Sequence, residues 1–154
     1  MTDAPLTHLD EQGRASMVDV GHKPPMRRTA VAEGALVAKA DTLDRLMSGD
    51  LPKGEALAVA RIAGIQAAKR CDELIPLCHT LPLDSVEVAF SRSAPDRLLV
   101  TTTARTTART GVEMEALIAA STALMTIWDM TNAVDTNLRV ESIVLREKTK
   151  EALT

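Results

Sequence analysis

Aromatic side chains are almost absent from this sequence, which has no tyrosine and whose only phenylalanine and tryptophan are Phe90 and Trp128. Modules that read single-stranded RNA stack its bases on aromatic side chains of a sheet, so the sequence argues against that function. Lysine and arginine are not in excess either, since the formal net charge is -3, whereas a nucleic-acid surface gathers positive charge. We therefore expect no nucleic-acid partner, and a core of alanine and aliphatic side chains.

Cysteine is also scarce, and Cys71 and Cys78 are the only two. One pair gives no disulfide framework, and their separation, without a second close ligand pair, does not match the usual zinc spacings. The longest apolar stretch, residues 116–128, is too short and too polar to span a bilayer, and the polar start has no signal-peptide pattern. We expect a cytoplasmic protein with no metal, no other cofactor and no membrane role.

Hydrophobic periodicity predicts one α+β domain over residues 31–147, between an irregular arm, residues 1–30, and a short tail, residues 148–154. The predicted elements are a strand at 31–38, a helix at 42–47 that Asp41 caps and Gly49 closes, a helix at 54–72, strands at 85–90 and 98–107, a helix at 114–134 and a strand at 138–146. This βαββαβ order is typical of a ferredoxin-like fold, in which helices cover one face of an antiparallel sheet. Because small core side chains fill little volume, we also expect several copies to assemble and bury further apolar surface.

Two lysines and a histidine flank the helix predicted at 54–72. Lys53 stands just before it, where free amides and the helix dipole favour an anion, although a Lys-Gly pair is more often part of a solvated loop. Lys69 ends the helix, and a cation there also stabilises the dipole without binding a ligand. His79 follows in a turn after Pro76 and is either a proton carrier near neutral pH or an ordinary surface histidine.

Acidic side chains gather around the helix predicted at 114–134. Glu113 and Glu115 would point about 200° apart in a helix but would share one side of an extended segment, and a functional pair requires the extended geometry. Carboxylates in a first helical turn also stabilise the dipole with no catalytic task. Asp129 and Asn132 lie three residues apart and share one helix face, which is either a site or an exposed surface.

Three motifs resemble one family closely: Ala-Arg-Ile-Ala-Gly-Ile-Gln-Ala-Ala-Lys at residues 60–69, Leu-Ile-Pro-Leu-Cys-His at 74–79 and Thr-Gly-Val-Glu-Met-Glu-Ala-Leu at 110–117. Together with Met-Val-Asp-Val at residues 17–20, they resemble the MoaC family, the cyclic pyranopterin monophosphate synthases of molybdenum-cofactor biosynthesis. The resemblance extends from about residue 6 to residue 145 in unbroken order.

The resemblance implies a lyase that converts a cyclised dihydro-GTP into cyclic pyranopterin monophosphate and releases pyrophosphate. Carried over position by position, it assigns catalysis to Lys53, His79, Glu113 and Asp129. It also implies a set of substrate-binding residues: Lys23, Arg28, Lys69, Leu77, Cys78, Met114, Glu115 and Asn132. The resemblance further implies a homohexamer, built as a trimer of dimers, with each site at a dimer interface.

Two features depart from the family pattern. Where the family usually reads Asp-Met-x-Lys-Ala-Val, residues 129–134 read Asp-Met-Thr-Asn-Ala-Val, so the amide of Asn132 replaces a lysine that would carry charge. The family's Gly- and Lys-rich tail is also absent, which leaves Lys148 or Lys150 as stand-ins. The sequence therefore keeps a second hypothesis open, a nucleotide-binding paralogue that is impaired or silent in catalysis.

Overall fold

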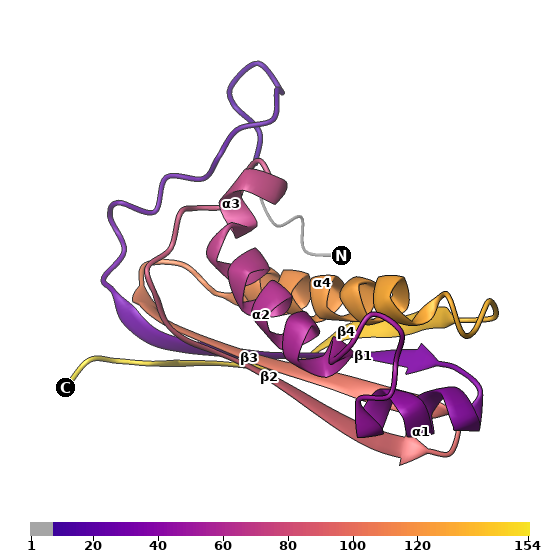
Figure 1. Cartoon of the computed structure of the whole chain (residues 1–154). Helices are drawn as coiled ribbons and strands as arrows, with labels where there is room; N and C mark the ends of the chain where they lie inside the picture. The colour runs from indigo at the N-terminus through magenta and orange to yellow at the C-terminus, as the bar shows by residue number, and fades with distance from the viewer. Residues whose placement is uncertain (1–7) are drawn as a thin grey trace.

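The computed structural model describes residues 8–154, so the first seven residues of the predicted arm lie outside the described part. Its elements are, in chain order, β1 (Met26–Val37), α1 (Ala40–Ser48), α2 (Ala56–Lys69), α3 (Cys71–Leu74), β2 (Leu83–Ala94), β3 (Arg97–Ala108), α4 (Glu113–Thr131) and β4 (Arg139–Glu151). The strands form one antiparallel sheet in the order β2-β3-β1-β4. Figure 1 shows α2 and α4 side by side over one face of this sheet. The predicted ferredoxin-like α+β fold is thus confirmed.

All four strands are longer than the sequence pattern predicts, and β2 extends beyond the predicted 85–90 at both ends, to Leu83 and Ala94. β1 begins at Met26, inside the segment predicted as an irregular arm, and β4 continues to Glu151, through half of the predicted tail. The extra residues pair with each other, since Arg28 lies opposite Lys150 in the antiparallel register. Backbone pairing of this kind needs no alternating apolar residues, so hydrophobic periodicity does not reveal it. The division of the chain into arm, domain and tail stays a prediction.

The helices depart from the predicted bounds in several places, and the helix predicted at 114–134 is α4, which ends at Thr131. The helix predicted at 54–72 is two helices, α2 and α3, because the backbone at Arg70 leaves helical geometry with φ -115° and ψ 22°. Gly49 closes α1 as predicted, with a left-handed φ of 76°. The predicted cap by Asp41 is wrong, because Asp41 lies in the first turn of α1 and the N-cap residue is Lys39, without a side-chain cap bond of its own.

The core is built from alanine and aliphatic side chains, as the composition predicts. Small residues let α4 lie close to both α2 and the sheet. A Cβ at Gly34 of β1 would lie 2.5 Å from Leu124, and one at Gly64 of α2 would lie 2.9 Å from the carbonyl oxygen of Ala119. Because close-packed cores respond to even one added methyl group, α4 is held tightly between α2 and the sheet.

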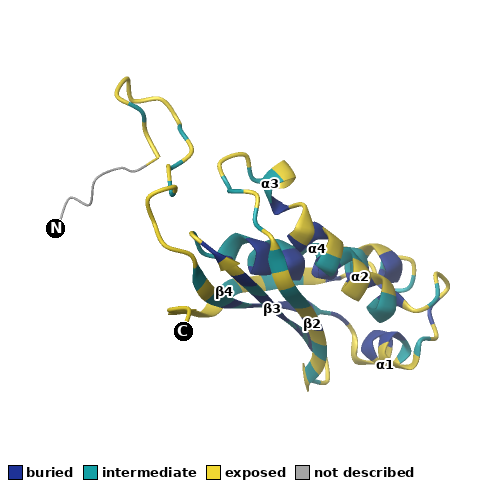
Figure 2. Cartoon of the chain, turned by 90° about the vertical axis from the view of Figure 1, so that its left-hand side faces the viewer, coloured by how far each residue is buried: buried dark blue, intermediate teal, exposed yellow. Residues whose placement is uncertain are grey.

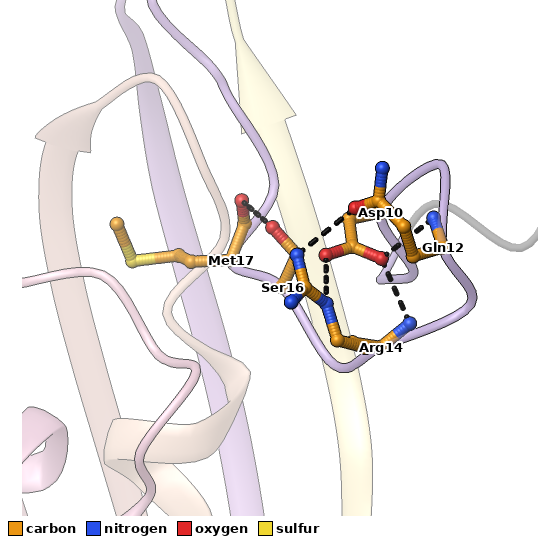
Figure 3. Close-up of polar contacts among 5 residues, drawn as sticks. All are labelled: Asp10, Gln12, Arg14, Ser16 and Met17. Carbon is orange, nitrogen blue, oxygen red and sulfur yellow. Dashed lines mark hydrogen bonds and ion pairs between the residues drawn. The ribbon is translucent and has the colours of Figure 1, made fainter.

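Residues 8–25 form an arm that rises beyond α3 (Figure 1) and is mostly exposed (Figure 2). A tight turn in the arm is held by the carboxylate of Asp10 (Figure 3), which accepts hydrogen bonds from the backbone N–H groups of Gln12 and Arg14, both at 2.9 Å. The guanidinium of Arg14 pairs with the same carboxylate at 2.8 Å. Among residues 8–154, no helix has the length and apolar character needed to cross a membrane.

Candidate active site

Two adjoining cavities lie at the N-terminal end of α4. The first, the histidine cavity, has a volume of about 300 Å³ and is lined by the arm, the turn after α3 and the start of α4. Seven predicted site residues line it: Lys23, Leu77, Cys78, His79, Glu113, Met114 and Glu115. The second, the basic cavity, has a volume of about 240 Å³ and is lined by parts of β1, β4 and the start of α4, including Arg28 and Lys148. Gly111 and Glu113 line both cavities.

His79 is half-buried and is fixed by the arm. Its Nε2 atom lies 2.7 Å from the backbone carbonyl oxygen of Val18. A carbonyl oxygen only accepts hydrogen bonds, so Nε2 carries the proton and donates it. In the neutral imidazole, Nδ1 is then the nitrogen that accepts a proton, and in the cation it is the nitrogen that gives one back. The contact with the arm therefore defines which ring nitrogen is available for proton transfer.

Glu113 and Glu115 both lie in the first turn of α4, so the extended segment that a functional pair was expected to require is not present. They nevertheless line the same histidine cavity in different surroundings. Glu113 is partly exposed, and its carboxylate lies 3.4 Å from the ammonium nitrogen of Lys148. Glu115 is buried, and this burial, together with the nearby charge of Glu113, raises the pKa of the Glu115 carboxyl. Two carboxyl groups in different surroundings thus face one space.

Three cations from neighbouring strands line the basic cavity. Arg28 comes from β1, and Lys148 and Lys150 come from the end of β4. The guanidinium of Arg28 donates to the carbonyl oxygens of Ala108 and Arg109, each at 3.3 Å, which holds it at the end of β3. The sequence offered Lys148 or Lys150 only as a stand-in for the family's basic tail, and both line this cavity. Their two-residue spacing is the strand period that places both on one face of β4.

The two cysteines are poor nucleophiles in this arrangement. Burial, with a further contribution from the negative charge of Glu115, raises the pKa of the Cys71 thiol to about 12. The same two causes raise the pKa of Cys78, which lines the histidine cavity. A thiol that holds its proton at neutral pH neither attacks a substrate nor binds a metal readily. Among residues 8–154, no three His, Cys, Asp or Glu side chains are grouped closely enough to hold a metal ion.

Three other predicted site residues meet at the opposite, C-terminal end of α4. Lys53 donates a hydrogen bond to the backbone carbonyl oxygen of Asp129 at 2.8 Å and lies 3.3 Å from its carboxylate. The last turn of α4 has no basic residue of its own, so the ammonium group of Lys53 supplies the cation that favours the negative end of a helix. Asn132 is the C-cap residue of the same helix. We call these three residues the lysine end.

One copy of the chain does not bring all the predicted catalytic residues together. His79 and Glu113 share the histidine cavity, whereas Lys53 and Asp129 pair at the lysine end. Glu113 and Asp129 are sixteen residues apart on α4, which is about 24 Å at a rise of about 1.5 Å per residue. Lys69, predicted to bind the triphosphate, is exposed in the last turn of α2 and lines neither of the two cavities.

Comparison with known proteins gives consistent matches along almost the whole chain. The model of the MoaC family matches residues 17–151. A cyclic pyranopterin monophosphate synthase of Herpetosiphon aurantiacus is 54% identical over 145 residues, which are 94% of this chain and 88% of that protein. The cyclic pyranopterin monophosphate synthase 1 of Mycobacterium tuberculosis is 52% identical over 143 residues, 93% of this chain and 84% of that protein. A synthase of the same name from Novosphingobium aromaticivorans is 53% identical over 143 residues, with coverages of 93% and 90%.

Proposed function

Because the chain belongs to the MoaC family, we propose that it is a cyclic pyranopterin monophosphate synthase of molybdenum-cofactor biosynthesis. The observation that carries this proposal is identity above 50% with synthases of that name over more than nine-tenths of the chain. The reaction converts a cyclised dihydro-GTP into cyclic pyranopterin monophosphate and releases pyrophosphate, so the enzyme is a lyase. We place it in the cytoplasm, because the substrate derives from a nucleoside triphosphate and the two cysteines need no oxidising compartment.

The basic cavity suits the triphosphate of this substrate. Arg28, Lys148 and Lys150 bring three positive charges to a space that one carboxylate, Glu113, also lines. Charge-assisted hydrogen bonds from such cations bind phosphate oxygens strongly. They also stabilise the negative charge that develops as pyrophosphate departs. We assign phosphate binding to these three residues, and we give Arg28 the most defined position, because two backbone carbonyl groups already hold its guanidinium.

The histidine cavity suits the purine-derived part of the substrate. It adjoins the basic cavity through Gly111 and Glu113, and the two together have a size within the range of roughly 300 to 1,000 Å³ that small-molecule sites usually have. Opening one ring and closing another requires several proton transfers. His79 offers its Nδ1 atom as a proton acceptor and donor. Burial raises the pKa of Glu115 and so favours the protonated form of its carboxyl group. These two residues are our candidates for proton transfer in this cavity.

The lysine end completes the site from a second copy. Asp129 lies near the C-terminal end of α4, and Lys53 is paired with it. Because the histidine cavity lies at the other end of α4, the length of the helix keeps both residues away from the cavity of their own chain. A two-fold pair of copies presents each surface twice, so the lysine end of one copy can face the histidine cavity of the other. We propose a dimer with two such composite sites, and a hexamer of three dimers. Native mass spectrometry measures this assembly directly.

The assay for the proposed function follows both products. Purified protein is incubated with the cyclised dihydro-GTP, the pterin product is separated by chromatography, and pyrophosphate is measured with a coupled enzyme. We expect one pyrophosphate for each pterin formed, and the Herpetosiphon aurantiacus synthase serves as a positive control. Substrate that binds but is not converted, under conditions in which that control is active, would support the silent paralogue in place of the enzyme.

A further inference from the structure

Asp135 is a buried carboxylate that belongs to neither cavity. It lies in the connection between α4 and β4 and is 1% exposed. An ionised carboxylate is costly to bury unless hydrogen bonds satisfy its oxygens. Its position just beyond the lysine end, together with its complete burial, calls for a physical explanation beyond that of a surface charge.

Three hydrogen bonds satisfy the Asp135 carboxylate. Its Oδ2 atom accepts the backbone N–H of Lys39 at 2.9 Å and the hydroxyl of Thr42 at 3.1 Å. Its Oδ1 atom accepts the backbone N–H of Asn137 at 2.9 Å. Burial alone raises the pKa of Asp135, but these donors outweigh it and bring the pKa below its ordinary value. The group is therefore ionised at neutral pH.

The carboxylate replaces the missing cap of α1. The N-cap residue Lys39 makes no side-chain capping bond, and Asp135 provides an acceptor from 96 residues away. An anion at the N-terminus of a helix also interacts favourably with the helix dipole. This contact attaches the start of α1 to the connection that follows the lysine end.

Hydrogen bonds hold the short segment between α1 and Lys53. Arg45 near the end of α1 accepts the backbone N–H of Asp50 at 2.9 Å and donates its guanidinium to the Asp50 carbonyl, also at 2.9 Å. A turn follows in which the N–H of Gly54 bonds to the carbonyl of Leu51 at 2.9 Å, and Lys53 lies within that turn. A displacement of α1 is therefore passed on to Lys53, because Asp50 bonds back to α1 and the next residue, Leu51, is buried in the same core cluster as Leu43 and Leu46 of α1.

We propose that Asp135 is a positioning residue for the lysine end: by fixing the start of α1 to the α4–β4 connection, it holds Lys53 in place against Asp129. The contact closes a ring of bonds that runs from Asp135 through α1 to Lys53, Asp129 and the end of α4. This inference rests on the proposed function, in which Lys53 takes part in catalysis. Small misplacements of such a group have large effects on rate.

The first test compares Asp135→Asn with Asp44→Asn. Asp135→Asn keeps the side-chain volume but removes the charge and one acceptor oxygen. Asp44 is an exposed carboxylate on α1, where it pairs with Arg92. We expect kcat of Asp135→Asn to fall roughly ten- to hundredfold with little change in KM, and the kcat of Asp44→Asn to stay within about twofold. An unchanged kcat in folded Asp135→Asn, or an equal loss in Asp44→Asn, would overturn the proposal.

A second readout does not require activity. Acetylation of the Lys53 amine by a reagent in limiting amount, measured by mass spectrometry, reports how firmly the ammonium group is held. Asp135→Asn should raise the labelling rate of Lys53 at least about threefold relative to Lys148, because the contact with Asp129 is loosened. Equal labelling in both proteins would contradict the inference. If the wild type makes no pterin but Asp135→Asn still raises the labelling rate of Lys53, the proposed enzyme activity is rejected and the positioning role of Asp135 stands.

The milder variant Thr42→Val covers the case in which Asp135→Asn does not fold. It removes one donor to the carboxylate, the Thr42 hydroxyl, and leaves the backbone bond from Lys39. We expect a smaller loss of kcat and a smaller rise in Lys53 labelling, both in the same direction as in Asp135→Asn. No change in either quantity would contradict the positioning role.

Discussion

Activity should return when two inactive variants of this protein are mixed. Lys53→Ala removes the cation of the lysine end, and His79→Ala removes the imidazole of the histidine cavity. Each variant alone lacks one group in every composite site and should be inactive. A mixed pair of copies is different, because both substitutions fall in one of its two sites and the other site is intact. The mixture therefore tests whether the site is shared.

The expected recovery follows from the arrangement of the two half sites. An intact site needs Lys53 from one copy and His79 from its neighbour. In an equal mixture that exchanges freely, each condition is met half of the time, so about one quarter of all sites are intact. Once pure assemblies have been removed, the intact fraction is about one half for separate dimers and stays close to one quarter for three dimers in a hexamer, where pure assemblies are rare. If all four catalytic residues came from one copy, no intact site would form and no activity would return.

The two variants are co-expressed with different affinity tags, so that mixed assemblies form during synthesis and are isolated by two successive purifications. Native mass spectrometry confirms their composition, and pterin formation gives the rate. The matched control mixes Lys53→Ala with Asp129→Ala. These two residues pair within one copy, so no combination restores a complete lysine end. Mixed Lys53→Ala and His79→Ala assemblies that stay inactive, or control assemblies that regain activity, would refute the shared site.

Three further predictions concern single positions. Lys148→Ala should lower kcat/KM roughly ten- to hundredfold, because it removes a charge-assisted contact of about 1.5 to 3 kcal/mol. The control is Arg139→Ala, at an equally exposed position at the other end of β4, and its kcat/KM should stay within about twofold of the wild type. Similar losses in both variants would exclude a phosphate contact of Lys148. Asn132→Lys should raise turnover by placing a second cation on the helix face that holds Lys53, and an unchanged single-turnover rate would show that the amide suffices. Burial raises the pKa of Glu115 above its ordinary value in the folded protein, so the contribution of this carboxyl to stability is full below the pKa of the unfolded state and is lost as pH rises through the folded pKa. The urea midpoint of Glu115→Gln should therefore gain on that of the wild type as pH rises above the ordinary glutamate pKa of about 4.3, and parallel pH curves would contradict this.

The order of the elements was predictable because each has a strong local signal. Alternation marked β3, a run of small residues at helical spacing marked α2, and Gly49 marked the end of α1 with the left-handed conformation that glycine favours. The beginning of β1 was not predictable in this way. Most of its first residues are polar, and they form a strand because β3 on one side and the far end of β4 on the other pair with them.

The sequence supplies candidate site residues by type but not their grouping. The family resemblance predicts Lys53, His79, Glu113 and Asp129 as catalytic residues, yet no local pattern shows that Lys53 meets Asp129 across 76 residues of sequence. The same holds for Asp135, whose partners come from α1. For Glu113 and Glu115, the expected need for an extended segment did not hold for another reason. The two side chains leave α4 in different directions, but a cavity at the end of a helix is reached from more than one direction, so both line it.

A conformational change within one copy is a poor substitute for a second copy. To bring Asp129 to the histidine cavity, α4 would have to bend or unwind along a length that is buried against α2 and the sheet. Gly64 meets the backbone of α4 so closely that even a methyl group would not fit, and loss of such packing costs several kcal/mol for each large side chain exposed. A neighbouring copy requires none of this, because it presents its own rigid lysine end. The close packing that makes α4 a fixed spacer is therefore the physical reason why the proposed site needs two chains.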